Sequence, residues 1–101
     1  MGFDVRLIPS ANLDLQRGIE YYLPFSKNLA SKFLDEFYLI LKQLEENPFF
    51  QIQLEPVRTI KLKHFPYIVH FIVDEISHKV IIIAIVFGKQ KKTNFSERIP
   101  K

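Results

Sequence analysis

The feature that most constrains this chain is an apolar run, VIIIAIVF, at residues 80–87. The run is much shorter than the ~20 residues that a helix needs to span a bilayer. β-Branched side chains dominate it, and such side chains favour strands. A strand without polar alternation has to be covered on both faces, so we expect residues 80–87 to lie centrally in a sheet.

Three other segments predict strands. VRTIKLK (57–63) alternates weakly, and YIVHFIVD (67–74) is rich in β-branched and aromatic residues. Together with residues 80–87, and with short turns between them, these two predict an antiparallel meander. FDVRLI (3–8) alternates apolar and polar side chains until Pro9 ends it. This segment either pairs beside residues 80–87 or closes an edge of the sheet, and the sequence leaves both arrangements open.

Two helices are predicted between the first strand and the meander. Ser10 is the expected N-cap of the first helix, which ends near Pro24. Ser26 opens the second helix, which ends at Asn47 and Pro48. Apolar residues recur at helical spacing in both: Leu15, Ile19, Tyr22 and Leu23 in the first, and Leu29, Phe33, Phe37, Ile40, Leu41 and Leu44 in the second. The connection is so short that the two helices should pack as an antiparallel hairpin.

The expected fold class is therefore α+β. Its order is β-α-α-β-β-β, with the helical hairpin packed on one face of a small, largely antiparallel sheet. Residues 49–56, FFQIQLEP, are expected to form the loop between the second helix and the meander. A chain of 101 residues is expected to form a single domain, residues 1–101, around one core.

Composition excludes several classes of protein. The chain has no cysteine, which rules out disulfides and thiolate chemistry and favours a cytoplasmic location. The start, MGFDVRLIPS, carries an acidic residue inside its apolar segment and predicts neither a signal peptide nor a membrane anchor. The three histidines fall on separate segments, so we expect no metal site, and we expect no cofactor.

The charge is unevenly distributed along the chain. Residues 1–56 carry five basic and eight acidic side chains, whereas residues 57–101 carry nine basic and three acidic ones. The two parts therefore have net charges of −3 and +6. Such an asymmetry favours a polyanionic partner, which is either a nucleic acid or an acidic protein segment.

The order of elements and several short patterns resemble the type II toxins of the RelE/ParE superfamily. The patterns are Ala11 with the aromatic pair Tyr21 and Tyr22, ASKF at 30–33, NP at 47–48, HFPYIVHFIVDE at 64–75 and AIVFGKQKKTNFSER at 84–98. The stretch at 64–75 resembles the subgroup of the family with FPY before the next-to-last strand. The resemblance covers nearly the whole chain, and it implies a toxin that is held by a cognate antitoxin protein.

Several positions depart from the ribonuclease members of the superfamily. Phe87 stands where many members have histidine, and Ile68 stands where ribonuclease members have an arginine in the strand. An apolar side chain cannot replace a guanidinium that grips phosphate. Gln90, Lys92 and Phe95 also differ from the family pattern, whereas Arg98 keeps its type.

Candidate site residues follow from the chemistry that remains. Cleavage of RNA by a 2′-hydroxyl needs a base, an acid and positive charge around the phosphorus. The catalytic candidates are Lys61, Lys63, His64 and Arg98, and Tyr67 and His70 are further groups of suitable type. Lys61 and Lys63 are expected to share one face of a strand near the basic tail. His70 lies within an apolar strand and is more readily interpreted as a satisfied, partly buried histidine.

Two binding surfaces are also predicted. Lys89, Lys91, Lys92 and Arg98 are candidates for contact with a target or a phosphate. Phe95 and Arg98 favour a tail that folds back on the sheet. The loops contain more apolar side chains than loops need, and we expect them to bind the antitoxin. These residues are Phe25, Phe49, Phe50 and Ile52.

Three functions remain open. The first is a ParE-like toxin that inhibits growth by binding a target of the DNA gyrase class, without catalysis. The second is a RelE-like, ribosome-dependent mRNA endonuclease that uses lysine and arginine side chains. The third is a module that has lost toxicity and only binds its antitoxin. The missing histidine and arginine favour the first, and the basic residues 57–101 favour the second.

Overall fold

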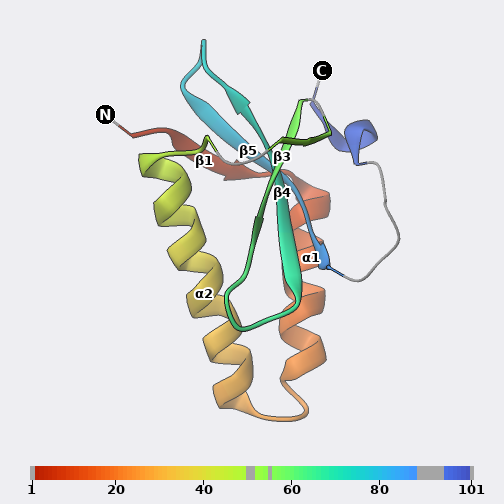
Figure 1. Ribbon diagram of the computed structural model, residues 1–101. Coiled ribbons are helices and arrows are strands. Elements are labelled where there is room, and N and C mark those ends of the chain that lie inside the picture. Colours follow the sequence, from red (N-terminus) through yellow and green to blue (C-terminus); the bar gives the residue numbers. More distant parts are fainter. Residues whose placement is uncertain (1, 50–51, 55, 89–94, 101) are drawn as a thin grey trace.

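The computed structural model describes residues 2–49, 52–54, 56–88 and 95–100 (Figure 1). The elements follow one another as β1 (Asp4–Leu7), α1 (Pro9–Tyr22), α2 (Lys27–Glu46), β2 (Ile52–Leu54), β3 (Val57–Lys61), β4 (Tyr67–Asp74), β5 (Lys79–Phe87) and a 3-10 turn, η1 (Ser96–Arg98). The two helices form a hairpin that covers one face of a single sheet. The predicted α+β fold class is confirmed.

The sheet has the strand order β1-β5-β4-β3-β2. β3, β4 and β5 form the expected antiparallel meander, and β1 pairs with β5 in parallel. β5 therefore has a strand on each side, as its apolar sequence predicted. The sequence did not decide the place of β1, which lies at an edge beside β5.

Three details of the prediction are wrong. The expected loop at residues 49–56 contains a short strand, β2, which pairs with β3 and is too brief to show an alternating pattern. α1 begins at Pro9 with Ile8 as its N-cap, so Ser10 is not the cap. Proline suits the first position of a helix because an N–H there has no acceptor within the helix, and proline has no N–H. β3 ends at Lys61, so Lys63 lies in the turn that follows and not on the strand.

The core lies between the helical hairpin and the inner face of the sheet. α2 contributes Phe33, Phe37 and Leu44, all at most 1% exposed. Ser26 caps this helix as predicted, since its side chain accepts a hydrogen bond from the main-chain N–H of Leu29 at 3.3 Å. Side chains on the inner face of β4 and β5 complete the core; they are Tyr67, Val69 and Phe71 on β4, and Val80, Ile82 and Ile85 on β5, where a bulge shifts the alternation between Ile82 and Ile85.

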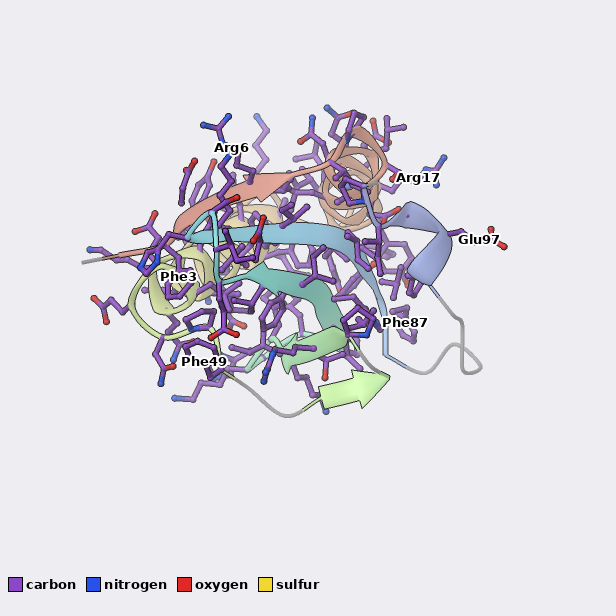
Figure 2. All side chains as sticks on the ribbon, turned by 90° about the horizontal axis from the view of Figure 1, so that it is seen from above. Phe3, Arg6, Arg17, Phe49, Phe87 and Glu97 are labelled. Atoms are coloured by element: carbon purple, nitrogen blue, oxygen red, sulfur yellow. The ribbon has the colours of Figure 1, made fainter. Side chains whose placement is uncertain are left out.

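Aromatic side chains mark the two ends of the sheet. Phe3 and Phe49 lie at one end, and Phe87 lies at the other (Figure 2). The rings of Phe3 and Phe49 make an edge contact at 5.9 Å, and the guanidinium of Arg58 lies 5.5 Å from the ring of Phe49.

Within the described residues, no helix is both long and apolar enough to cross a membrane.

Candidate functional site

The candidate site lies along the edge of β5 that β1 leaves uncovered. β1 ends where α1 begins, and the last main-chain bond to this edge among the described residues runs from the N–H of Ile8 to the carbonyl of Ile82 at 3.1 Å. At this point β5 contains a bulge, because His70 pairs with Ala84 but Phe71 pairs with Ile82. A bulge adds one residue to one strand and re-aims the groups that follow it. Beyond Ile82, no strand in the described part of the chain pairs with this edge.

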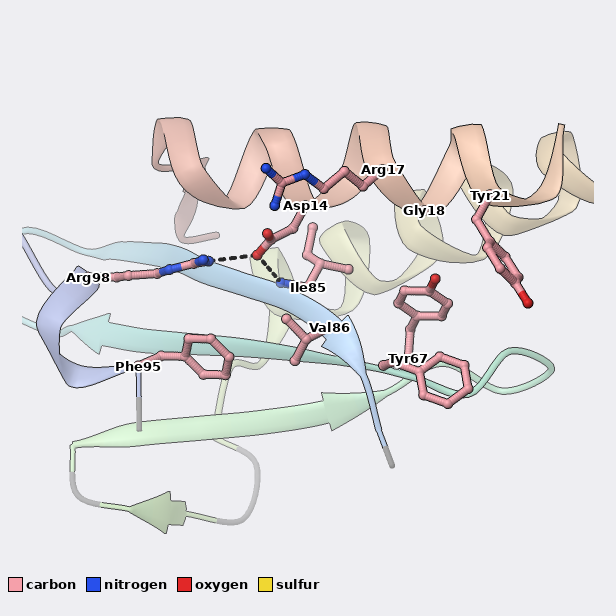
Figure 3. A pocket seen from close by; sticks show the side chains of 10 residues that line it. Asp14, Arg17, Gly18, Tyr21, Tyr67, Ile85, Val86, Phe95 and Arg98 are labelled. Carbon is pink, nitrogen blue, oxygen red and sulfur yellow. Dashed lines mark hydrogen bonds and ion pairs between the residues drawn. The ribbon is translucent and has the colours of Figure 1, made fainter. Parts of the chain in front are cut away.

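Two side chains take the place of the missing strand. A carboxylate oxygen of Asp14, on α1, accepts a hydrogen bond from the N–H of Ile85 at 3.1 Å and another from the guanidinium of Arg98 at 2.7 Å (Figure 3). The same nitrogen of Arg98 donates to the carbonyl of Ile83 at 3.1 Å. The Asp14 side chain is 7% exposed and that of Arg98 is 29% exposed. The described part of the tail, residues 95–100, is thus held against β5, which confirms that the tail folds back on the sheet.

His70 lies beneath this segment, on the face of the sheet opposite the helices. Its strand neighbours Val69 and Phe71 belong to the core, so alternation directs His70 to the other face. There Phe95 covers it with an edge contact at 4.8 Å, and only 5% of the histidine is exposed. Burial, together with the positive charge of Arg98, lowers the pKa of His70 to about 4, although Asp14 acts in the opposite sense. His70 is therefore neutral at physiological pH, and it is a buried histidine, as the sequence favoured, although it lies outside the core.

A pocket of about 720 Å³ continues along the same edge. α1 lines one side of it with Asp14, Arg17, Gly18 and Tyr21 (Figure 3). The strands supply Tyr67, Ile85, Val86 and Phe87, and the tail supplies Phe95 and Arg98. Burial, together with the neighbouring tyrosines Tyr22 and Tyr21, raises the pKa of Tyr67. The pocket therefore holds aromatic side chains, one exposed arginine and one arginine bound to a carboxylate.

The other catalytic candidates lie in a second pocket, of about 530 Å³, between α2 and the end of β3. This second pocket is lined by Lys61, Lys63 and His64 together with Glu36. Arg98 and Phe95 do not line it. The carboxylate of Glu36 contacts the Nδ1 of His64 at 2.5 Å and accepts the main-chain N–H of His64 at 3.0 Å. Burial opposes the ionisation of Glu36, but the hydrogen bonds from His64 prevail and lower its pKa. The imidazole itself is 72% exposed.

The structure does not gather the remaining predicted residues into one surface. Phe25 is 71% exposed and Phe49 is 49% exposed, but they flank opposite ends of α2, whose 20 residues span about 30 Å. Three of the predicted target contacts, Lys89, Lys91 and Lys92, lie outside the described residues, as does Phe50. Ile52 lies on β2. Among the described residues, no group of three or more histidine, cysteine and acidic side chains is placed to hold a metal ion.

Asp14 and Arg17 were not singled out by the sequence analysis. The signal for Asp14 is nevertheless present, because it falls on the buried side of α1 with Ala11, Leu15 and Gly18. A carboxylate on the buried side of a helix needs a partner. Arg98, which keeps the residue type of the family pattern, could have been expected as that partner.

Comparisons with known proteins show a likeness in fold to solved structures. No protein-family model matches the chain, and no curated protein matches it in sequence. Among solved structures, a chain described as belonging to the chromosomal ParDE TA system from P. aeruginosa superposes with a TM-score of 0.73 at 20% sequence identity. The match covers 86% of this chain and 97% of that chain. The two chains therefore share a fold over nearly their whole length.

Proposed function

We propose that this protein is the toxin of a type II toxin-antitoxin system and that it is ParE-like. In this proposal it inhibits growth by binding a cellular target of the DNA gyrase class, without breaking a bond itself, and a cognate antitoxin neutralises it. The shared fold with a chain of a ParDE TA system supports the class of protein. The stretch at residues 64–75, which resembles the FPY subgroup, supports it independently.

The separation of the candidate catalytic groups is the observation that favours a toxin that binds its target over one that cleaves RNA. Arg98 is bound to Asp14 in the pocket beside α1, whereas Lys61, Lys63 and His64 line the pocket beside α2. A phosphoryl transition state needs its proton carriers and its positive charges around one phosphorus atom. In the described part of the chain, these groups do not converge on one point.

The test is to induce the protein alone in bacterial cells and to follow two processes in the same culture. Plasmid topoisomers report DNA supercoiling, and incorporation of a labelled amino acid reports translation. We expect supercoiling to change before translation slows, and we expect purified protein to inhibit supercoiling by purified gyrase. As a matched control, Ile76→Ser changes a side chain that is 99% exposed in the β4–β5 turn and should leave toxicity unaltered.

One observation favours the endonuclease as the second candidate. Glu36 holds the imidazole of His64 by its Nδ1, the other ring nitrogen belongs to an exposed side chain, and Lys61 and Lys63 line the same pocket. A carboxylate that orients an imidazole is a common arrangement for a general base. If translation stops first, with messages cut inside ribosomes, and His64→Gln abolishes that cutting, the endonuclease replaces our proposal. If neither process changes on induction, the non-toxic antitoxin-binding module replaces it.

A further inference from the structure

α2 has a face that is open to solvent. Its buried side chains point into the core; they are Ala30, Phe33, Phe37, Ile40 and Leu44. On the outward side of the helix lie Tyr38, which is 55% exposed, and Leu39, which is 63% exposed. α2 itself lies on the side of the molecule away from the tail (Figure 1). These two adjacent side chains, the apolar pair, are therefore open to a partner.

Charged side chains flank the apolar pair in a symmetric pattern. Asp35 stands three positions before the pair, and Lys42 stands three positions after it. Three positions further out, Lys32 precedes and Glu45 follows. All four charged side chains are exposed, and none forms an ion pair with a residue that the structure describes. Each charge on one side of the apolar pair therefore has the opposite charge at the equivalent position on the other side.

This pattern is complementary to itself when the helix is reversed. A two-fold axis through the midpoint of the apolar pair sets α2 antiparallel to α2 of a second copy. Asp35 then lies opposite Lys42 of the second copy, and Lys32 lies opposite Glu45 of the second copy. A two-fold interface repeats each contact, so opposite charges meet at both ends of the contact and the apolar pairs meet at its centre.

We infer that this protein forms a homodimer in which α2 packs antiparallel against α2 of a second copy. The contact runs from Lys32 to Glu45, which is about 20 Å of helix. Burial of the apolar pairs drives the association, and the ion pairs fix its direction and register, as charges beside the seam of a coiled coil do. A contact between two helices is small among protein interfaces, so we expect dimer and monomer to exchange. The inference goes beyond the proposed function and does not depend on it.

The second pocket, between α2 and the end of β3, receives side chains of the second copy in this dimer. Leu39 and Lys42 belong to its lining. Tyr38 of the second copy lies opposite Leu39 and covers the pocket there. Asp35 of the second copy brings a carboxylate to Lys42, beside the other two lysines of the pocket. No residue of α2 lines the pocket beside Arg98, so the dimer leaves the candidate site at β5 open on each copy.

Other occupants fit this face less well. Parallel pairing of two copies would place Asp35 opposite Asp35 and Lys42 opposite Lys42, and like charges there oppose association. A nucleic acid or an anionic membrane would meet the carboxylates of Asp35 and Glu45. A different protein does not require a pattern that is complementary to itself.

Sedimentation equilibrium of the full chain over about a hundredfold range of concentration tests the inference. We expect a reversible equilibrium between monomer and dimer. Asp35→Lys and Lys42→Asp, each made alone, should weaken dimerisation about tenfold, because each places like charges opposite one another twice. An equimolar mixture of these two variants should dimerise nearly as well as the unaltered chain, because each chain then meets its opposite charges in the other.

The matched control is Glu20→Lys, a charge reversal at an exposed position of α1, which should change the dimerisation constant less than about twofold. Leu39→Ser should weaken dimerisation without altering any charge, and circular dichroism will show whether each variant folds. In ¹⁵N-labelled protein, dilution should shift the amide signals of residues 32–45 and leave those of residues 85–87 in place.

Several results would overturn the inference. A chain that stays monomeric over the whole range of concentration has no such interface. A chain that dimerises equally well with Asp35→Lys or with Lys42→Asp pairs through another surface. Two charge variants that stay monomeric when they are mixed have lost dimerisation for a reason other than charge. If a charge reversal unfolds the chain, Leu39→Ser decides, and undiminished dimerisation of that variant overturns the inference.

Discussion

The ion pair between Asp14 and Arg98 predicts a large loss of stability when one partner is removed. The variant is Arg98→Ala. It leaves the Asp14 carboxylate, 7% exposed, with the N–H of Ile85 as its remaining donor among the described residues, and it leaves the carbonyl of Ile83 without the guanidinium. Loss of one partner from a buried pair costs about 3 to 5 kcal/mol. Because Arg98 is 29% exposed, water can replace part of the interaction, and we expect about 3 kcal/mol.

The measurement is urea unfolding followed by circular dichroism. For a slope of about 1 to 1.5 kcal/mol per molar urea, a loss of about 3 kcal/mol lowers the midpoint by about 2 to 3 M. The matched control is Arg6→Ala, which breaks a 2.8 Å pair with Asp4 whose side chains are 68% and 51% exposed. A surface pair of this kind contributes at most about 1 kcal/mol, so its midpoint should move little.

A double-mutant cycle tests whether the effect belongs to the pair. Asp14→Ala alone should cost about as much as Arg98→Ala, because it leaves a guanidinium and an N–H without their acceptor. The double variant should cost about 2 kcal/mol less than the sum of the two, since neither group is then left without its partner. If Arg98→Ala is as mild as Arg6→Ala, or if the two costs simply add, our structural role for Arg98 is wrong and its guanidinium is available to a target.

Three further predictions concern the interior and the helix cap. The pKa of His70 is about 4 in the folded chain and 6.5 ordinarily, so the unfolded chain binds the proton first as the pH falls. The free energy of unfolding should therefore fall by up to ~3 kcal/mol as the pH drops from about 6.5 to about 4. Urea titrations at several pH values measure this dependence, and His70→Gln should flatten it. Gly18→Ala should lower the free energy of unfolding by about 1 to 3 kcal/mol, because the new Cβ clashes with the ring of Phe33. Gly18→Ala should cost less when it is made in a chain that already carries Phe33→Leu. Equal costs with Phe33 and with Leu at that position would contradict the clash. Ser26→Ala should cost about 1 kcal/mol by removing the cap of α2, and Ser26→Asp should retain most of it.

Much of the fold was predictable because its signals are local. The apolar run at residues 80–87 required a strand with neighbours on both sides, and the short connection ending at Ser26 required a helical hairpin. The same reasoning failed at β2, whose three residues pair with β3 but carry no periodicity. It also failed at Lys63, which continues the alternation of β3 after the strand has ended. In each case the pairing partner, and not the local pattern, decides where the strand lies.

The candidate site was harder to predict because it depends on contacts between distant segments. Nothing near Arg98 in sequence shows that its acceptor is Asp14, 84 positions away. The bulge that directs the carbonyl of Ile83 toward Arg98 arises from the pairing of β4 with β5 and leaves no trace in an unbroken run of isoleucines. Gly18 was not singled out from the sequence, because its close contact with Phe33 depends on how the two helices pack.

The pairing of β1 with β5 also bears on the order in which the chain folds. The α1–α2 and β4–β5 hairpins join neighbouring segments, whereas Asp4 pairs with Lys79. Closing such a long loop costs more entropy than closing a hairpin, so the hairpins should form first and the edge of β5 should be completed late. Interactions formed after the transition state govern how fast a protein unfolds. The ion pair between Asp14 and Arg98 lies on this edge and should form after the transition state. Its loss should therefore raise the unfolding rate and leave the folding rate nearly unchanged.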